Sequence, residues 1–144
     1  MKLNYSIFIV LLVFICILVT NCNLHSSKTI REDNVVKKEE RILGKFTSID
    51  LSMQAEVKIY QGTPQKILVE GSISDLKKII TETEDSKLII RTQPGTWQLG
   101  KIYVFVTIDK LTDIYVNGSG KVFYSANHFV VTHITGSGKI TKME

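Results

Sequence analysis

Cysteine, proline and alanine are scarce in this sequence, and each scarcity excludes something. The chain of 144 residues has two cysteines and two prolines. Cys16 lies inside an apolar run and would leave with a cleaved leader, so the rest of the chain has too few thiols for a disulfide or a cysteine-based metal site. From Ile42 onward only Ala55 and Ala126 are alanines, while 33 of those 103 residues are Ile, Val or Thr. This composition favours strands over helices.

Clustered charge is also missing. The sequence has 18 Lys and Arg against 14 Asp and Glu, a formal charge of +4, and the basic residues are scattered. Nucleic-acid binding needs a basic stripe or patch, so this class is excluded. His128 and His133 are five residues apart, which places them on opposite faces of a strand and argues against a shared metal. We expect no cofactor and no metal.

The longest apolar run, residues 7–19, is short. As a helix it would span about 20 Å, against a bilayer core of about 30 Å. With Lys2 before it and polar residues after it, the run is typical of a secretory signal peptide. It ends Val19-Thr20-Asn21-Cys22, which resembles the lipobox of bacterial lipoproteins, although Asn21 replaces the usual small residue.

These features predict a signal peptide over residues 1–21, lipid on Cys22 and attachment to the bacterial envelope, most simply the outer membrane, facing the periplasm or the outside. Several acyl chains on one residue give stable anchoring. A membrane-retained short anchor and simple secretion are the alternatives. Residues 22–40 are strongly charged and read as a tether, with a short helix over 34–41 as the alternative. The folded domain is then expected over 41–144.

Alternating apolar residues mark the strands of this domain. Ala55, Val57 and Ile59 share one face, and a second such series runs from Ile102 to Ile108. Period-two alternation indicates half-buried strands. Residues 74–83 are the one place where a helix competes, and we expect a short turn followed by a strand there.

A repeat occupies the C-terminal end. Residues 116–122, Val-Asn-Gly-Ser-Gly-Lys-Val, recur 18 positions later as Ile-Thr-Gly-Ser-Gly-Lys-Ile at 134–140. Such a period indicates stacked turns of a β-solenoid, although Asn-Gly also favours a plain β-hairpin. In a stack, Val116 would lie over Ile134, Ile114 over Thr132 and Val122 over Ile140. The corner glycines would be Gly118, Gly120, Gly136 and Gly138, needed for close backbone approach or positive φ.

Groups suited to catalysis are few. Asp109 and Asp113 are four residues apart, and Glu82, Glu84 and Asp85 cluster at an expected turn, where solvated charge is usual. We therefore expect no enzymatic activity, with a carbohydrate-active enzyme as the weakest alternative.

Three aromatic residues offer a candidate ligand surface. Trp97 stands in a polar loop, and Tyr103 and Tyr115 lie on strand faces opposite the aliphatic ones. Exposed rings suit sugar or partner recognition. The alternative is that these rings only cover the second face of the strands or pack under the loop.

Residues 41–51, 55–62 and 85–90, together with the two Gly-Ser-Gly segments, resemble the putative auto-transporter adhesin head GIN domain family. The resemblance covers about residues 40–144. It implies an all-β, right-handed parallel β-helix-like domain, commonly behind a lipoprotein signal, without established enzymatic activity. The expected function is thus a non-catalytic envelope lipoprotein that presents a surface for binding or adhesion, with a small-ligand or glycan-binding module as the alternative.

Two departures from the family pattern carry expectations. The family generally has Pro where Asp109 stands. Its members also continue through further turns after the second Gly-Ser-Gly, whereas Gly138 is followed by six residues. The last strands would then present an open edge, which recruits other strands. Either the chain is truncated, or a second subunit or a protein partner covers this edge, and we expect self-association.

Overall fold

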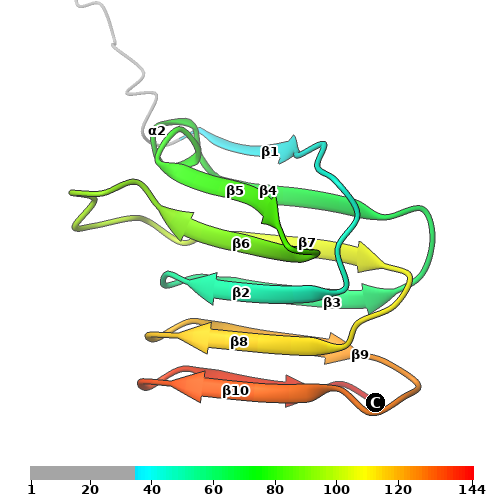
Figure 1. Ribbon diagram of the computed structural model, residues 1–144. Helices are drawn as coiled ribbons and strands as arrows, with labels where there is room; N and C mark the ends of the chain where they lie inside the picture. The colour runs from blue at the N-terminus through cyan, green and yellow to red at the C-terminus, as the bar shows by residue number, and fades with distance from the viewer. Residues whose placement is uncertain (1–34) are drawn as a thin grey trace, which may run out of the picture. The chain divides into compact units, whose positions relative to one another are not determined.

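The computed structural model describes residues 35–144, which form eleven strands and one short helix (Figure 1). The expected all-β class is confirmed. The strands are β1 (Val36–Glu40), β2 (Ser48–Ser52), β3 (Glu56–Gln61), β4 (Lys66–Ser72), β5 (Ile79–Glu84), β6 (Lys87–Thr92), β7 (Tyr103–Ile108), β8 (Asp113–Asn117), β9 (Lys121–Ser125), β10 (Val131–Thr135) and β11 (Lys139–Lys142), and the helix is α2 (Ile73–Leu76). Within this range no helix is long and apolar enough to cross a bilayer. The predicted signal peptide, Cys22 and most of the predicted tether lie outside the described residues.

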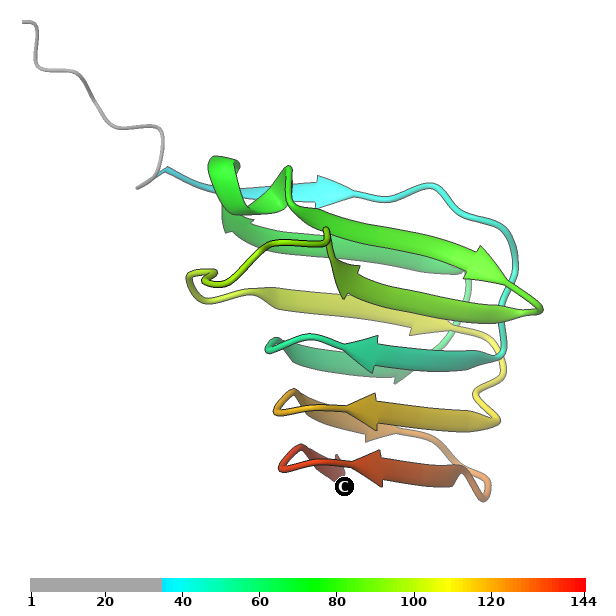
Figure 2. The same cartoon turned by 60° about the vertical axis from the view of Figure 1, so that its left-hand side comes forward.

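The strands form two mixed sheets. Sheet A has the order β1-β4-β7-β3-β9-β11, and sheet B the order β10-β8-β2-β6-β5. Most neighbours are parallel, but β4 pairs antiparallel with both β1 and β7, and β5 pairs antiparallel with β6. The parallel β-helix-like domain that the family resemblance implies is therefore corrected to two mixed sheets. Antiparallel strands complete both sheets at the end where β1 and β5 lie (Figures 1 and 2).

Four β-arches connect the sheets, each a strand of sheet B followed by a strand of sheet A: β2–β3, β6–β7, β8–β9 and β10–β11. Their order in space differs from their order in the chain, because the β2–β3 arch lies between β6–β7 and β8–β9. The start of β8 is held beside the start of β2 by Thr112, whose backbone N–H and side-chain hydroxyl both donate to the Thr47 carbonyl, at 2.7 and 3.1 Å. After the β6–β7 arch, the chain therefore crosses to the other side of the β2–β3 arch, where it forms the β8–β9 and β10–β11 arches.

The repeated segments stack as the 18-residue displacement predicts. In the parallel pair β8/β10, Val116 is opposite Ile134 and Ile114 is opposite Thr132. In the parallel pair β9/β11, Val122 is opposite Ile140. The hairpin alternative is wrong, because the strands on either side of each Gly-Ser-Gly segment belong to different sheets.

Aliphatic side chains fill the space between the sheets. The faces predicted from alternation are confirmed: Ala55, Val57 and Ile59, and Ile102 to Ile108 at every second position, are all buried. Sheet B contributes residues such as Ile49, Leu51, Leu88, Ile90, Ile114 and Val116. Burying one such side chain contributes about 1.5–3 kcal/mol, so this layer is the main source of stability.

The Gly-Ser-Gly corners are glycine-rich for two separate reasons. Gly118 and Gly136 have φ of +114° and +112°, which side chains rarely adopt. Gly120 and Gly138 instead face the preceding corner. A Cβ at Gly120 would lie 2.8 Å from the Met53 carbonyl oxygen and would also strike Leu51, and one at Gly138 would lie 2.9 Å from the Gly120 carbonyl oxygen. Gly136 meets both constraints, because a Cβ there would also lie 2.8 Å from the Gly118 carbonyl oxygen.

Two segments differ from expectation in detail. Residues 36–40, assigned to the tether, form β1 and pair with β4, where Lys38 Nζ lies 3.0 Å from Glu70. The alternative of a helix over 34–41 is also wrong. Where a short turn was expected, residues 73–76 form the single-turn helix α2, with the Ser72 hydroxyl accepting from the Asp75 N–H at 3.1 Å, and the strand expected after it is β5.

Replacing Gly120 by alanine tests the nesting of the corners. We expect Gly120→Ala to lower the free energy of unfolding by about 1–3 kcal/mol, because the added methyl overpacks a backbone contact. Each kcal/mol lowers the melting temperature by about 4–8 °C in a domain of this size. Thermal unfolding followed by circular dichroism measures the effect. Ser137→Ala, at an exposed corner position, is the control and should stay within about 0.5 kcal/mol of the wild type. Equal melting of the two variants would contradict the nesting.

Candidate functional site

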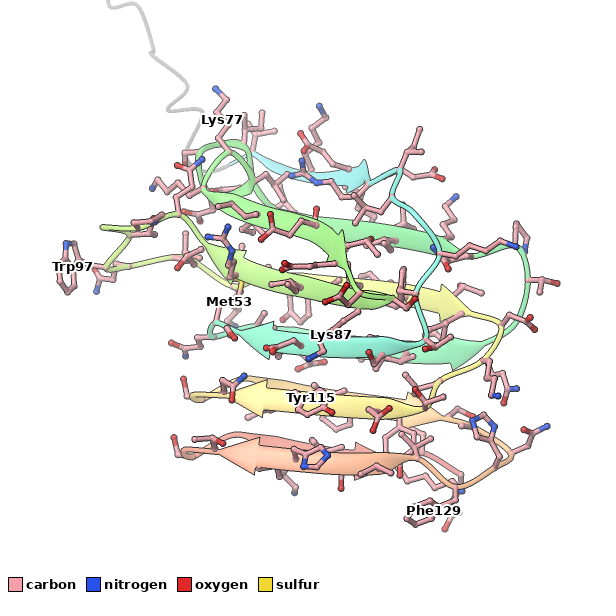
Figure 3. The ribbon with its side chains drawn as sticks, viewed as in Figure 1. Met53, Lys77, Lys87, Trp97, Tyr115 and Phe129 are labelled. Carbon is pink, nitrogen blue, oxygen red and sulfur yellow. The ribbon has the colours of Figure 1, made fainter. Side chains whose placement is uncertain are left out.

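The connection between β6 and β7 is the exceptional corner of the domain. The corners of the other three arches cover residues 53–55, 118–120 and 136–138, whereas this one covers residues 93–102. Figure 3 shows it extending past the ends of the strands, with Trp97 near its tip. We call residues 93–102 the long corner. Extended loops on a rigid scaffold are where binding residues concentrate.

Hydrogen bonds fix both ends of the long corner. At its start, the Gln93 N–H donates to the Lys78 carbonyl at 2.8 Å, and the Gln93 side-chain amide donates to the Lys77 carbonyl at 3.0 Å. At its end, the Gly100 N–H donates to Asp75 Oδ2 at 3.0 Å. The corner is therefore anchored to the segment around α2.

Asp75 is the buried charged residue that carries this anchor. Burial raises the pKa of its carboxyl, but hydrogen bonds from the Ser72 hydroxyl and the Gly100 N–H, together with the Lys78 ammonium 3.6 Å away, outweigh burial and leave the pKa below its ordinary value of 3.8. The carboxyl is thus ionised at neutral pH. Since its oxygens are engaged by these donors, its role is to position the long corner.

Two adjoining hollows lie under the long corner. The larger, with a volume of about 520 Å³, is lined by Gln54, Ala55, Glu56, Leu99, Gly100, Lys101, Ile102, Tyr103, Ser119 and Lys121. The smaller, about 150 Å³, is lined by Met53, Gln54, Thr92, Thr96, Trp97, Gln98 and Leu99. They share Gln54 and Leu99 and together form what we call the corner groove. It is wide open to solvent, and most of its lining side chains are polar.

Two of the three predicted aromatic residues line the corner groove, one in each hollow. Trp97 is 94% exposed and lines the smaller hollow, and Tyr103 is half-buried and lines the larger one. Packing of Trp97 under its loop, the alternative expectation, is wrong. Tyr115 lies elsewhere, on β8 of sheet B (Figure 3). Tyr103 begins β7 of sheet A, at a position that alternates with the buried residues of that strand. The predicted surface of all three rings is thereby corrected to the corner groove with two.

Tyr115 belongs to a separate row on the outward face of sheet B. Its ring stacks on His133 with centroids 4.5 Å apart and planes 5° apart, and Lys87 Nζ lies 4.4 Å from the Tyr115 centroid. Nearby, Asp50 Oδ1 accepts from Ser52 Oγ at 2.8 Å and from Asn117 Nδ2 at 3.0 Å. The sequence contained a signal for the stack, since Tyr115 and His133 are separated by the 18 residues of the repeat.

The acidic residues considered for catalysis occupy ordinary positions. Glu82 pairs with Arg91, with Oε1 and Nε 2.9 Å apart, and Glu84 and Asp85 are exposed at the β5–β6 turn. Asp109 is exposed after β7, and Asp113 begins β8. Residues 35–144 contain no group of three His, Cys, Asp or Glu side chains able to hold a metal. The corner groove is the candidate site.

The structure is an all-β, two-sheet domain with a polar groove under its longest corner. Residues 45–143 match the family described as "putative auto-transporter adhesin, head GIN domain", and the chain belongs to this family. No curated protein matches the chain.

Solved structures show the same fold. The crystal structure of a putative adhesin from Bacteroides fragilis is similar with a TM-score of 0.68 at 16% identity, covering 76% of this chain and 53% of that one. A putative lipid binding protein from Parabacteroides distasonis has a TM-score of 0.67 at 14% identity, covering 75% and 49%. A putative adhesin from Parabacteroides merdae has a TM-score of 0.58 at 9% identity, covering 76% and 57%. The chain thus spans about half the length of these relatives.

Proposed function

We propose that this chain is a non-catalytic binding domain of the bacterial cell envelope and serves adhesion. Its family and the names of two of its structural relatives refer to adhesins. The observation that carries the proposal is the corner groove, in which an anchored loop holds Trp97 almost fully exposed. A large apolar ring kept in water by a rigid scaffold is typical of a recognition surface.

We also propose that the arches form a short right-handed β-solenoid, closed by antiparallel strands at one end. The in-register parallel pairs β2/β8, β8/β10, β3/β9 and β9/β11 support this proposal. Such a stack resists bending because every strand is hydrogen-bonded along its length, and rigidity suits a domain that holds a surface away from a membrane.

A glycan is the ligand class that the corner groove fits best. Aromatic rings stack on sugar faces, and polar side chains such as Gln54 and Ser119 can bind hydroxyl groups. The putative lipid binding protein among the structural relatives suggests lipid as the other class. The larger hollow has three aliphatic side chains in its lining, Ala55, Leu99 and Ile102. This apolar surface is too small to enclose an acyl chain.

A glycan array with the wild type and two variants tests this function. We expect Trp97→Ala to weaken binding about five- to tenfold, because an aromatic contact contributes about 1–1.4 kcal/mol. Tyr115→Ala removes an aromatic ring from the other sheet and should bind as the wild type does. Absence of any glycan binding by the wild type, or equal binding by Trp97→Ala, would overturn glycan recognition at the groove.

We propose that Cys22 carries lipid and anchors the domain to the envelope. The lipobox-like segment and the short apolar run before it support this proposal. Protease treatment of intact and lysed cells, with Cys22→Ala beside the wild type, tests it. We expect the wild type in the membrane fraction and Cys22→Ala in the soluble fraction. Digestion in intact cells would place the domain outside, where adhesion operates, and protection until lysis would place it in the periplasm. Unchanged membrane attachment of Cys22→Ala would contradict lipidation.

We propose that a second copy of the chain pairs with β10 and β11. These are the outermost strands of their sheets among the described residues. Ile134 is aligned with buried Val116 but is 49% exposed, and Phe129, two residues before β10 begins, is 86% exposed. A two-fold axis would bring two such ends together, since each offers one free edge from each sheet.

Light scattering over a wide concentration range measures this association. We expect the wild type to form dimers and Ile134→Asp to remain monomeric, because a charge at the centre of the contact opposes its burial. Ile42→Asp, at a fully exposed position before β2, is the control and should dimerise. A wild type that stays monomeric throughout would overturn the proposal.

A further inference from the structure

The lining of the corner groove has more basic than acidic side chains. Of its lining residues, Lys101 and Lys121 are exposed and take part in none of the ion pairs found within residues 35–144. The carboxylate of the lining, Glu56, already pairs with Lys58, with Oε1 and Nζ 3.4 Å apart. Glu56 is also the strand partner of Lys121, so a single carboxylate is shared between Lys58 and Lys121 and the groove keeps a net positive charge.

The strand register adds a third lysine, which lies beside Lys121. Lys139 on β11 is the parallel partner of Lys121 on β9. Like charges on neighbouring strands repel and destabilise a sheet. Lys139 is also outside the ion pairs of the described residues. A bound anion would relieve this repulsion, so the same feature that costs stability in the free protein favours an anionic ligand.

The remaining lining points to a carbohydrate as the carrier of that charge. Trp97 and Tyr103 offer ring surfaces at the two hollows, and Gln54, which is common to both, offers an amide. An open groove with this mixture suits a chain of sugar rings, each with one flat apolar face and several hydroxyl groups. Figure 3 shows Trp97 projecting into solvent from the long corner, where a sugar could reach its ring.

We infer that the corner groove binds acidic oligosaccharides, with Lys101 and Lys121 contacting carboxylate or sulfate groups and Trp97 stacking on a sugar ring. This inference rests on the proposed glycan-binding function and names its substrate class. A lysine ammonium acts on such groups as a point charge, and its contribution depends on ionic strength.

Matched acidic and neutral sugars test the inference. The purified protein is titrated with oligogalacturonate, with its methyl ester, which has the same backbone without charge, and with a panel of other acidic and neutral oligosaccharides. We expect acidic members to bind at least about tenfold more tightly than neutral ones. Their affinity should fall between about 0.1 M and about 1 M salt, as the Debye length shortens from about 10 Å to about 3 Å.

Variants assign the effect to the groove. The double variant Lys101→Gln/Lys121→Gln should lose about tenfold or more in affinity for acidic sugars while its affinity for neutral ones stays the same. Lys110→Gln is the matched control, because Lys110 is also an exposed lysine outside the ion pairs of the described residues but follows β7, whereas Lys101 precedes it. Melting temperatures equal to that of the wild type show that the variants fold.

The outcomes separate the inference from the proposed function. Equal binding of oligogalacturonate and its methyl ester, or a double variant that binds acidic sugars as the wild type does, would overturn the acidic ligand and leave glycan recognition standing. No binding of any oligosaccharide in the panel would overturn both.

Discussion

Close contact between successive corners is the constraint on which the whole domain depends. Parallel strands in both sheets stay in register only if the corners that join the sheets stack at the same spacing as the strands, about 4.8 Å. At that spacing the backbone of one corner touches the next. The Gly120 position lies against Met53 and Leu51, and the Gly138 position against Gly120 and Val116. Without a Cβ at these two positions, the aliphatic layer between the sheets can close.

The same constraint limits where on the domain a groove can form. Corners of three residues nest on one another with their backbones in contact, so each leaves little room for a cavity of its own. The β6–β7 connection escapes this limit because it is longer and is held from the side, through Asp75 and the carbonyls of Lys77 and Lys78. It can therefore overhang its neighbours. A groove forms where a long, anchored connection lies beside short, stacked ones.

In-register stacking also determines how the outward faces are built. When residues 18 positions apart lie side by side, the chemistry of one arch is placed beside that of the next. Tyr115 and His133 gain a favourable aromatic contact in this way, whereas Lys121 and Lys139 are brought together with like charge. The first arrangement stabilises the stack. The second leaves two neighbouring ammonium groups whose repulsion a bound anion would reduce.

The sequence by itself determined the class of the fold, the buried face of each strand and the stacking of the last two arches. Period-two alternation predicts which side chains of a strand face the core. The 18-residue repeat with its glycines predicts the register in which β8 pairs with β10 and β9 pairs with β11. The sequence also named Trp97 and Tyr103, although it grouped them with Tyr115. Only the tertiary structure decided that β2–β3 lies between β6–β7 and β8–β9, that β1 joins sheet A, and that Tyr115 faces away from the groove. The physical reason is that strand pairing uses backbone hydrogen bonds common to all residues, and every strand offers a similar aliphatic face. Alternation therefore cannot predict which strand pairs with which, and only the packing of the whole domain selects the pairs.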